Sequence, residues 1–200
     1  MDCWRRQKRL SGKMLMEIKL PEGFDNKEDA MEALVQRDLE AAESELCIIR
    51  EGMERFLLDN KGYPPDEVEK EVEFAFVVGS EKCRSKADFI IKISDRRLML
   101  VKCYIGALVS RERQAVACAR VMDSYQVPFA VVTDGNNAEI LDTLTGKVIG
   151  EGLEKIPSKA ELEAKLEGIK FKGLAPDRAE KEKRILLAFD VIKCSINYGE

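Results

Sequence analysis

The fold of this chain is decided by the stretch Ala87-Asp88-Phe89-Ile90-Ile91-Lys92-Ile93-Ser94-Asp95-Arg96-Arg97-Leu98-Met99-Leu100-Val101-Lys102-Cys103-Tyr104. Its two halves are rich in β-branched and apolar residues, and the polar residues 94–97 between them have the composition of a turn. The pattern therefore predicts two neighbouring strands. Because side chains at positions i and i+2 share one face of a strand, we expect Lys102 and Tyr104 to point to the same side, together with Asp88, and Cys103 to point to the other.

The sequence on either side of this stretch predicts helices and further strands. A helical spacing of apolar residues begins after Asn26, a plausible N-cap, and continues to Asn60. The other expected elements are a strand at Glu71–Val78, a polar loop at Gly79–Ser85, a helix at Ser110–Val121, strands at Phe129–Thr133, Ala138–Leu141 and Lys147–Ile149, and helices at Lys159–Glu167 and Pro176–Cys194. This order predicts an α/β fold, a mixed β-sheet flanked by helices with extra C-terminal helices.

The same pattern predicts three segments along the chain. Residues 1–25 form a basic N-terminal segment, residues 26–156 form the α/β domain, and residues 157–200 form a C-terminal helical appendage.

Composition excludes several classes of protein. The 200 residues include no histidine, so catalysis by Ser-His-Asp or Cys-His groups and zinc sites built on histidine are excluded. A catalytic site would have to use carboxylates, Lys, Tyr or Cys, and carboxylates favour a hard cation such as Mg²⁺. The longest apolar runs are far too short to span a membrane, and no apolar stretch of a secretory signal follows the basic N-terminus. We therefore expect a cytoplasmic protein.

Five short segments occur in an order that is typical of a known family. They are Ile49-Arg50-Glu51, Gly62-Tyr63-Pro64, Lys86-Ala87-Asp88-Phe89, Gln114-Ala115-Val116-Ala117-Cys118-Ala119 and Pro128-Phe129-Ala130-Val131-Val132-Thr133-Asp134-Gly135. From about Leu46 to Asp142 the chain resembles the N-terminal domain of type I restriction enzyme R subunits, in the PD-(D/E)xK nuclease superfamily. The resemblance implies a restriction-endonuclease-like sheet, a Mg²⁺ ion held by an Asp and a second acidic residue, a catalytic Lys, and a supporting Gln.

The chain departs from this family at two of the four signature positions. The family's core strand reads L-L-V-V-E-C-K, and an alignment without gaps from Leu98 places Lys102 at the Glu position and Tyr104 at the Lys position. Asp88 and Gln114 match. A lysine brings a positive charge to the place of a metal ligand and can pair with Asp88 instead. We therefore expect a catalytically degenerate site made of Asp88, Lys102, Tyr104 and Gln114.

Three functions stay open at this point. The first is a protein that keeps the nuclease fold and binds nucleic acid or a partner without catalysis. The second is an active Mg²⁺-dependent endonuclease that uses Asp88, a relocated glutamate and Lys102; Glu71 is the candidate second metal ligand, with Glu73, Glu45 and Glu51 as further choices. The third is a non-catalytic scaffold that assembles through its C-terminal helix, as a homodimer or with restriction-modification subunits.

Basic residues lie on both sides of Asp88 in the sequence. They are Arg84, Lys86, Lys92, Arg96, Arg97, Arg111 and Arg113. A groove that binds DNA phosphates would use such residues, and Arg84, Lys86, Arg111 and Arg113 are the nucleic-acid-binding candidates. A solvated charged face is the other interpretation.

Overall fold

The computed structural model describes residues 26–194, and the predicted basic segment 1–25 lies outside them. The chain forms two compact units, Met1–Ala41 and Ala42–Glu200. The described part of the first unit belongs to helix α1 (Lys27–Arg55). The predicted N-cap is confirmed, because Oδ1 of Asn26 accepts a hydrogen bond of 2.8 Å from the backbone N–H of Asp29.

The end of α1 belongs to the second unit and contributes to its core. Met53 is buried, and so is Leu57 in the π-helical turn Phe56–Asn60 that follows. Gly52 does not break the helix, and a Cβ at this position would meet nothing within 4 Å. The chain then reverses at Gly62, whose φ of +74° suits a residue without a side chain. Tyr63 follows, and its hydroxyl donates to the carbonyl of Pro157 at 2.7 Å.

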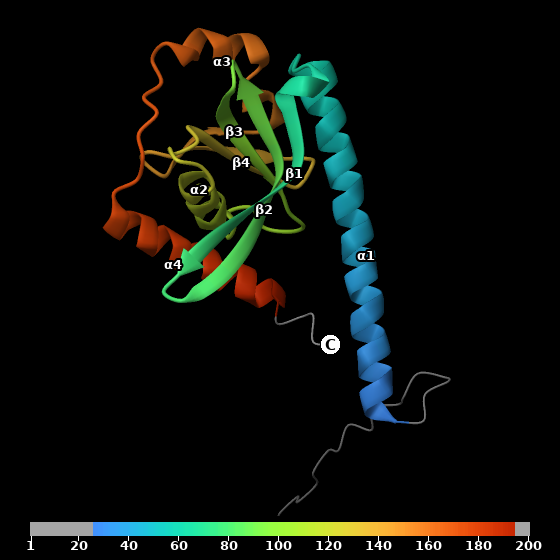
Figure 1. The fold of residues 1–200 in the computed structure, drawn as a ribbon. Coiled ribbons are helices and arrows are strands. Elements are labelled where there is room, and N and C mark those ends of the chain that lie inside the picture. Colours follow the sequence, from blue (N-terminus) through green and yellow to red (C-terminus); the bar gives the residue numbers. More distant parts are fainter. Residues whose placement is uncertain (1–25, 195–200) are drawn as a thin grey trace, which may run out of the picture. The chain divides into compact units, whose positions relative to one another are not determined.

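The second unit is built around a six-stranded sheet (Figure 1). Its strands are β1 (Val68–Val78), β2 (Glu81–Ile93), β3 (Arg96–Cys103), β4 (Phe129–Thr133), β5 (Ala138–Asp142) and β6 (Lys147–Glu151), in that spatial order. Only β3 and β4 run parallel, and the helix α2 (Glu112–Val121) connects them. The other neighbours are antiparallel. The predicted mixed α/β architecture is confirmed.

Two tight hairpins shape the first three strands. The predicted loop at Gly79–Ser85 is wrong, because only Gly79 and Ser80 form the turn, and Val78 already pairs with Glu81. The polar residues after Glu81 belong to an exposed two-stranded part of the sheet, where backbone pairing with β1 replaces the apolar pattern that normally marks a strand. The second hairpin turns at Ser94 and Asp95, whose φ angles are +49° and +60°.

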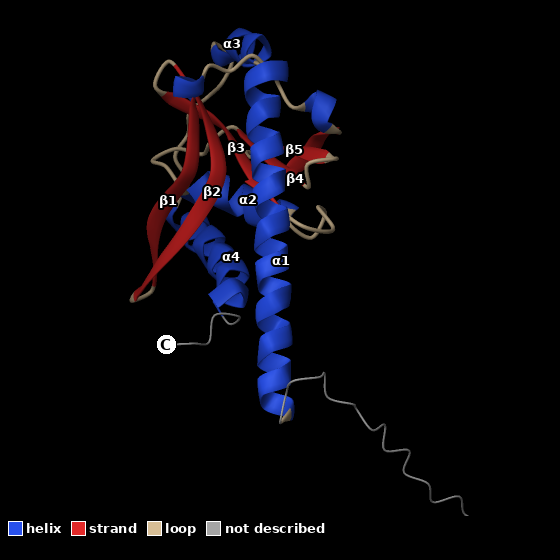
Figure 2. Cartoon of the chain, turned by 90° about the vertical axis from the view of Figure 1, so that its right-hand side faces the viewer, coloured by secondary structure: helices blue, strands red, loops and turns tan. Residues whose placement is uncertain are grey.

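Helices cover both faces of the sheet (Figure 2). On one face, α2 and α4 (Pro176–Cys194) form a core with the sheet that includes Leu100, Ala117 and Leu186. On the other face, the end of α1 and α3 (Lys159–Leu166) pack on residues such as Val101 and Leu162. Strand β4 is buried from both sides, as its continuous apolar sequence predicts.

The helices after the sheet begin where the sequence predicts. Ser158 and Glu161 form a capping box at the start of α3, with both reciprocal hydrogen bonds present. Helix α4 begins at Pro176, a residue that is favoured in the first turn. Among the residues that the structure describes, none of the helices combines the length and the apolar character that crossing a membrane requires.

Candidate functional site

The candidate site lies where strands β2 and β3 stop pairing. The pair that adjoins the site is Phe89 and Val101, and Asp88 precedes Phe89 on β2. Its side chain is 6% exposed, and its Oδ2 accepts a hydrogen bond of 2.8 Å from the backbone N–H of Cys103. The carboxylate thus takes the place of a backbone carbonyl at the point where the two strands separate.

The other oxygen of Asp88 binds a permanent cation. Nε of Arg50, on the part of α1 that packs against the sheet, donates to Oδ1 at 2.7 Å. Burial alone would lower the pKa of Arg50, but the charge and hydrogen bond of Asp88 outweigh it and raise this pKa above its ordinary value. The guanidinium therefore stays charged at any ordinary pH and neutralises Asp88.

Lys102, the residue before Cys103 on β3, is almost completely buried. It is 3% exposed, and its Nζ donates to the backbone carbonyl of Lys86 at 2.8 Å. The same Nζ lies 5.9 Å from the centre of the Tyr104 ring. Lys102 and Tyr104 thus share one side of the strand, and Cys103 packs in the core of the opposite face, as expected from the alternation.

Tyr104 and Gln114 form a buried chain of hydrogen bonds that ends on α4. The hydroxyl of Tyr104 donates to Oε1 of Gln114 at 3.1 Å, and Nε2 of Gln114 donates to Oδ1 of Asp190 at 3.1 Å. The guanidinium of Arg111 lies 5.3 Å from the centre of the Tyr104 ring. Burial raises the pKa of Tyr104 well above its usual range, so the phenol stays neutral. It cannot do the work of a cationic lysine at this position.

Glu71 is near the site and belongs to a different ion pair. On β1 it lies between Lys70, which pairs with Phe89, and Val72, which pairs with Ala87. Its carboxylate is exposed and bonds Nζ of Lys86, and this hydrogen bond lowers the pKa of Glu71. Its φ of +51° is unusual for a residue with a side chain. Glu45, Glu51 and Glu73 are not among the groups bonded to Asp88 or Lys102.

The side chains at the site do not fit a Mg²⁺ ion. Mg²⁺ requires near-octahedral oxygen coordination, usually with one or two carboxylates and several waters. Here Asp88 is held by Arg50 and by the N–H of Cys103, and the neighbouring strand offers Lys102. Among the side chains that the structure describes, no three of His, Cys, Asp or Glu are grouped so that they could hold a metal ion.

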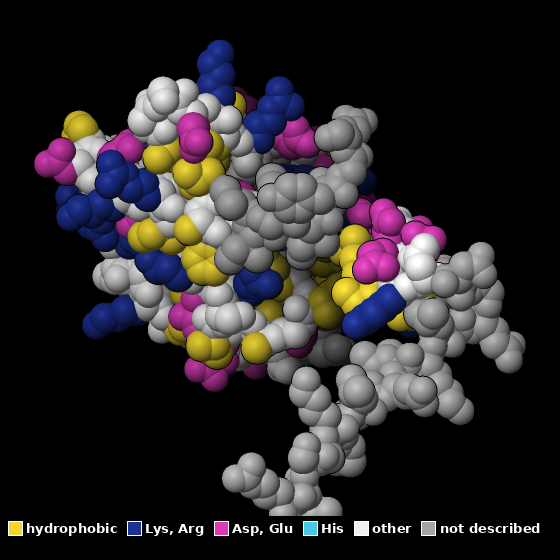
Figure 3. Space-filling view, turned by 90° about the horizontal axis from the view of Figure 1, so that it is seen from below, with side chains coloured by type: hydrophobic (Ala, Val, Ile, Leu, Met, Phe, Trp, Pro, Cys, Tyr) yellow, Lys and Arg dark blue, Asp and Glu magenta, His cyan; other side chains and the backbone are white. Residues whose placement is uncertain are grey.

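The predicted basic residues are distributed over several places. Lys86 and Arg111 are close to the site, and Arg113 bonds Glu182 of α4 at 2.6 Å. Arg97 lies five residues before Lys102 on β3, about 16 Å away along the strand. On the face seen in Figure 3, Lys and Arg side chains are scattered among acidic and apolar ones.

The other predicted basic residues contact groups away from the site or have no bonded partner among the described residues. Arg97 pairs with Glu69 and Asp123, Arg96 lies over the Tyr125 and Phe171 rings, and Lys92 lies 3.8 Å from Asp95. No hydrogen bond or ion pair of the Arg84 side chain is seen in the described part of the chain. The structure therefore brings together Asp88, Lys102, Tyr104, Gln114, Lys86 and Arg111, but not the other basic residues.

Sequence reasoning missed the partners that matter most here. Arg50 belongs to the segment Ile49-Arg50-Glu51, which resembles the family, but no sequence pattern pairs it with Asp88, 38 residues later. The acceptor of Gln114 on α4, Asp190, is 76 residues away and equally invisible. The one available signal is helical spacing. Arg50 lies about one turn before Met53, which is buried, so it is near the helix face that packs on the sheet.

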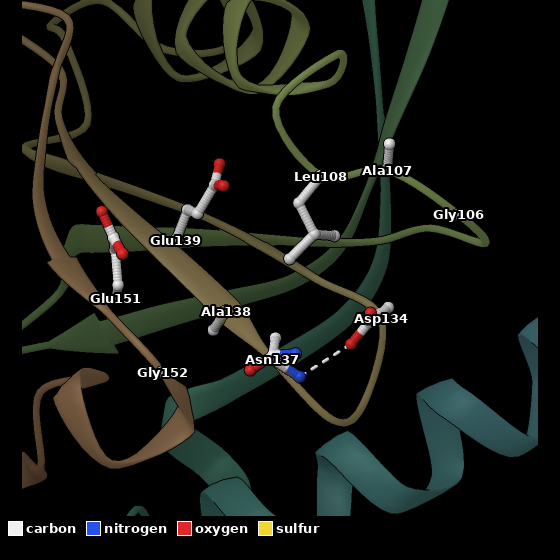
Figure 4. A pocket seen from close by; sticks show the side chains of 9 residues that line it. All are labelled: Gly106, Ala107, Leu108, Asp134, Asn137, Ala138, Glu139, Glu151 and Gly152. Atoms are coloured by element: carbon white, nitrogen blue, oxygen red, sulfur yellow. Dashed lines mark hydrogen bonds between the residues drawn. The ribbon is translucent and has the colours of Figure 1, made fainter.

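A second group of carboxylates lines a cavity of about 310 Å³ near the loop that follows β3 (Figure 4). Glu139 of β5 and Glu151 of β6 are paired in the ladder, and their carboxylates project to the same side of the two strands. Oε2 of Glu139 is occluded and has no hydrogen-bond donor in the described structure. Burial and the neighbouring carboxylate of Glu112 raise the pKa of Glu139 to about 7.

Comparison with known proteins gives one family match. Residues 46–157, more than half of the chain, match the model of the family described as Type I restriction enzyme R protein N terminus (HSDR_N). No curated protein and no solved structure matches the chain.

Proposed function

The chain belongs to the type I restriction enzyme R protein N-terminus (HSDR_N) family, and on this premise we propose that it is a non-cleaving member that binds nucleic acid. The binding surface is the region around Asp88, where the family would perform hydrolysis.

The ion pair between Arg50 and Asp88 is the observation that carries this proposal. A nuclease of this type needs its aspartate free to bind a cation from solution. Here the carboxylate is buried, bonded at 2.7 Å to a guanidinium and at 2.8 Å to a backbone N–H. A Mg²⁺ ion would have to displace Arg50 and lie beside Lys102, and Coulomb repulsion opposes both.

The charge around the site favours a polyanion over a metal ion. Four cations lie at or near it, Arg50, Lys86, Lys102 and Arg111, against the three carboxylates of Asp88, Glu71 and Asp190. Lys102 is too buried to touch a phosphate, so it acts through the local potential only. Lys86 and Arg111 are the groups that can reach a nucleic-acid backbone.

A metal and cleavage assay tests the loss of catalysis. We expect no saturable binding of Mg²⁺ or Mn²⁺ at millimolar concentration in calorimetry, and no cleavage of plasmid or single-stranded DNA. Metal-dependent cleavage that disappears in Asp88→Ala would overturn the proposal. It would favour an active enzyme in which Glu71, which also attracts Arg50, completes the metal site.

A salt titration tests the binding. We expect log K for a short DNA or RNA to fall linearly with log salt concentration, as phosphate contacts require. The double variant with Lys86→Ala and Arg111→Ala should weaken binding and flatten the slope by about two, one for each contact. Lys147→Ala, on the edge strand β6, is the matched control and should bind like the parent protein. Equal losses in both variants would contradict the assigned surface.

A further inference from the structure

We propose that the protein has a second anion site, a phosphate pocket between α2 and α4. It is a cavity of about 360 Å³ that three arginines line, Arg113, Arg120 and Arg178. None of the residues that line it belongs to the candidate site around Asp88. The pocket therefore stands independently of the proposed function.

Arg120 is the fixed part of the pocket. Its side chain is 4% exposed, and all of its polar contacts are short. Nε donates to the carbonyl of Thr143 at 2.8 Å, Nη2 to the carbonyl of Leu144 at 3.2 Å, and Nη1 to Oε1 of Glu182 at 2.8 Å. These bonds hold the guanidinium rigidly, so an arriving anion meets a group that is already oriented.

Glu182 does not neutralise all the positive charge. Its two oxygens bind Arg120 and Arg113, at 2.8 and 2.6 Å. Arg178 lies one helical turn earlier on α4 and has no bonded carboxylate among the described residues. Burial lowers the pKa of Arg120, Glu182 opposes this effect, and the charges of Arg178 and Arg113, which line the same cavity, lower the pKa further.

The rest of the lining is compatible with a phosphate. Its second carboxylate, Glu112, interacts with Glu139 on β5, so three guanidinium groups face two carboxylates. The turn that ends at Gly146 approaches Arg120 without a side chain, since a Cβ at this glycine would lie 3.5 Å from Nη2. Guanidinium groups match phosphate oxygens in geometry and form strong, charge-assisted hydrogen bonds with them. The ligand class is a phosphate, carried by a small molecule or by a nucleic-acid backbone.

Arg178 provides a clean test because it is exposed and forms no ion pair with the residues that the structure describes. We compare Arg178→Ala with Arg184→Ala, which removes another exposed arginine of α4 that does not line the pocket. The probe is inorganic phosphate, followed by ³¹P NMR line broadening and by thermal shift. We expect saturable binding to the parent protein and to Arg184→Ala, and at least tenfold weaker binding to Arg178→Ala.

Competition experiments identify the source of the phosphate, and they distinguish failure of this site from failure of the proposed function. Competition by a short oligonucleotide assigns the pocket to a nucleic-acid backbone, and competition by a nucleoside monophosphate alone assigns it to a small molecule; both support the site. Absence of phosphate binding, or equal binding by Arg178→Ala and Arg184→Ala, overturns it. Nucleic-acid binding that depends on Lys86 and Arg111, in a protein that binds no inorganic phosphate, would leave the proposed function intact while this site fails.

Discussion

At the scale of single residues, the chemistry of this domain is governed by which charge is next to which carboxylate. Asp88 has a permanent cation, Arg50, as its partner. The charged groups that raise the pKa of Glu139 are two other carboxylates, Glu112 from α2 and Glu151 from β6. The first arrangement occupies the carboxylate of Asp88 with a cation, while the second favours a proton on Glu139. Both give predictions that a single substitution can check.

Replacement of Arg50 by Ala should lower the free energy of unfolding by about 3 kcal/mol, because it leaves a buried carboxylate without its counter-charge. Urea denaturation measures the loss. Arg55→Ala is the control on the same helix, since Arg55 is exposed and, in the described part of the chain, its side chain bonds the carbonyl of Glu51 alone. Its effect should stay within about 0.5 kcal/mol. Similar losses in the two variants would show that the ion pair does not stabilise the fold.

Glu139 should make the protein less stable as the pH rises. Its pKa in the folded protein, about 7, lies above the ordinary 4.5, so the folded state holds the proton more tightly. The resulting stability is fully present below pH 4.5 and is lost as the pH rises through 7. In Glu139→Gln this part of the pH dependence should vanish when melting temperatures are compared between pH 5 and 8. Glu163→Gln, on the exposed side of α3, should keep it; an unchanged profile in Glu139→Gln would refute the assignment.

At the scale of elements, turn residues decide how the long strands are joined. The β2–β3 hairpin places Ser94 and Asp95 at positive φ, a conformation that glycine and asparagine adopt more readily. The β1–β2 hairpin already uses Gly79 at a φ of +59°. The β2–β3 hairpin therefore has backbone strain at Ser94, while Gly79, at the equivalent position of the β1–β2 hairpin, has none.

Asp95→Gly should therefore stabilise the protein by about 0.5–1 kcal/mol, because glycine has no side chain to clash at positive φ. The lost contact with Lys92, at 3.8 Å and with Asp95 fully exposed, contributes little. Asp95→Ala is the control, since it removes the same contact but keeps the strained conformation. Chemical denaturation should show a gain for Gly and none for Ala. Equal effects would indicate that the side chain, not the backbone, matters.

At the scale of the whole molecule, the sheet separates two cores that are closed by helices from distant parts of the sequence. Leu186 of α4 is fully buried on one face and Leu162 of α3 is fully buried on the other. The sheet and both C-terminal helices therefore depend on one another for burial of apolar surface.

Leu186→Ala and Leu162→Ala should each cost about 2–5 kcal/mol, the usual range for emptying a leucine site in a core. Because the two residues lie in separate cores, the double variant should lose the sum of the two values within about 0.5 kcal/mol. Circular dichroism and hydrogen exchange should both report a single unfolding transition for the unit Ala42–Glu200. Loss of a helix before the sheet would contradict this mutual dependence, and strong non-additivity would contradict the separation of the two cores.

The sequence by itself determined the elements whose signals are local. The apolar run Phe129–Thr133, the cap at Ser158 and the start of α4 at Pro176 can be read from neighbouring residues, and so can the alternation of Lys102, Cys103 and Tyr104. The prediction that Lys102 and Tyr104 replace the family's Glu and Lys likewise depends only on the order of the residues.

Only the tertiary structure decided which groups meet. The exposed part of β2 is a strand because β1 supplies its hydrogen bonds, and polar residues carry no periodic sign of that pairing. Arg50 bonds Asp88, and Glu182 gathers Arg113 and Arg120, across separations of 38, 69 and 62 residues. Packing of helices on the two faces of the sheet fixes these neighbours, and local preferences along the chain contain no information about them.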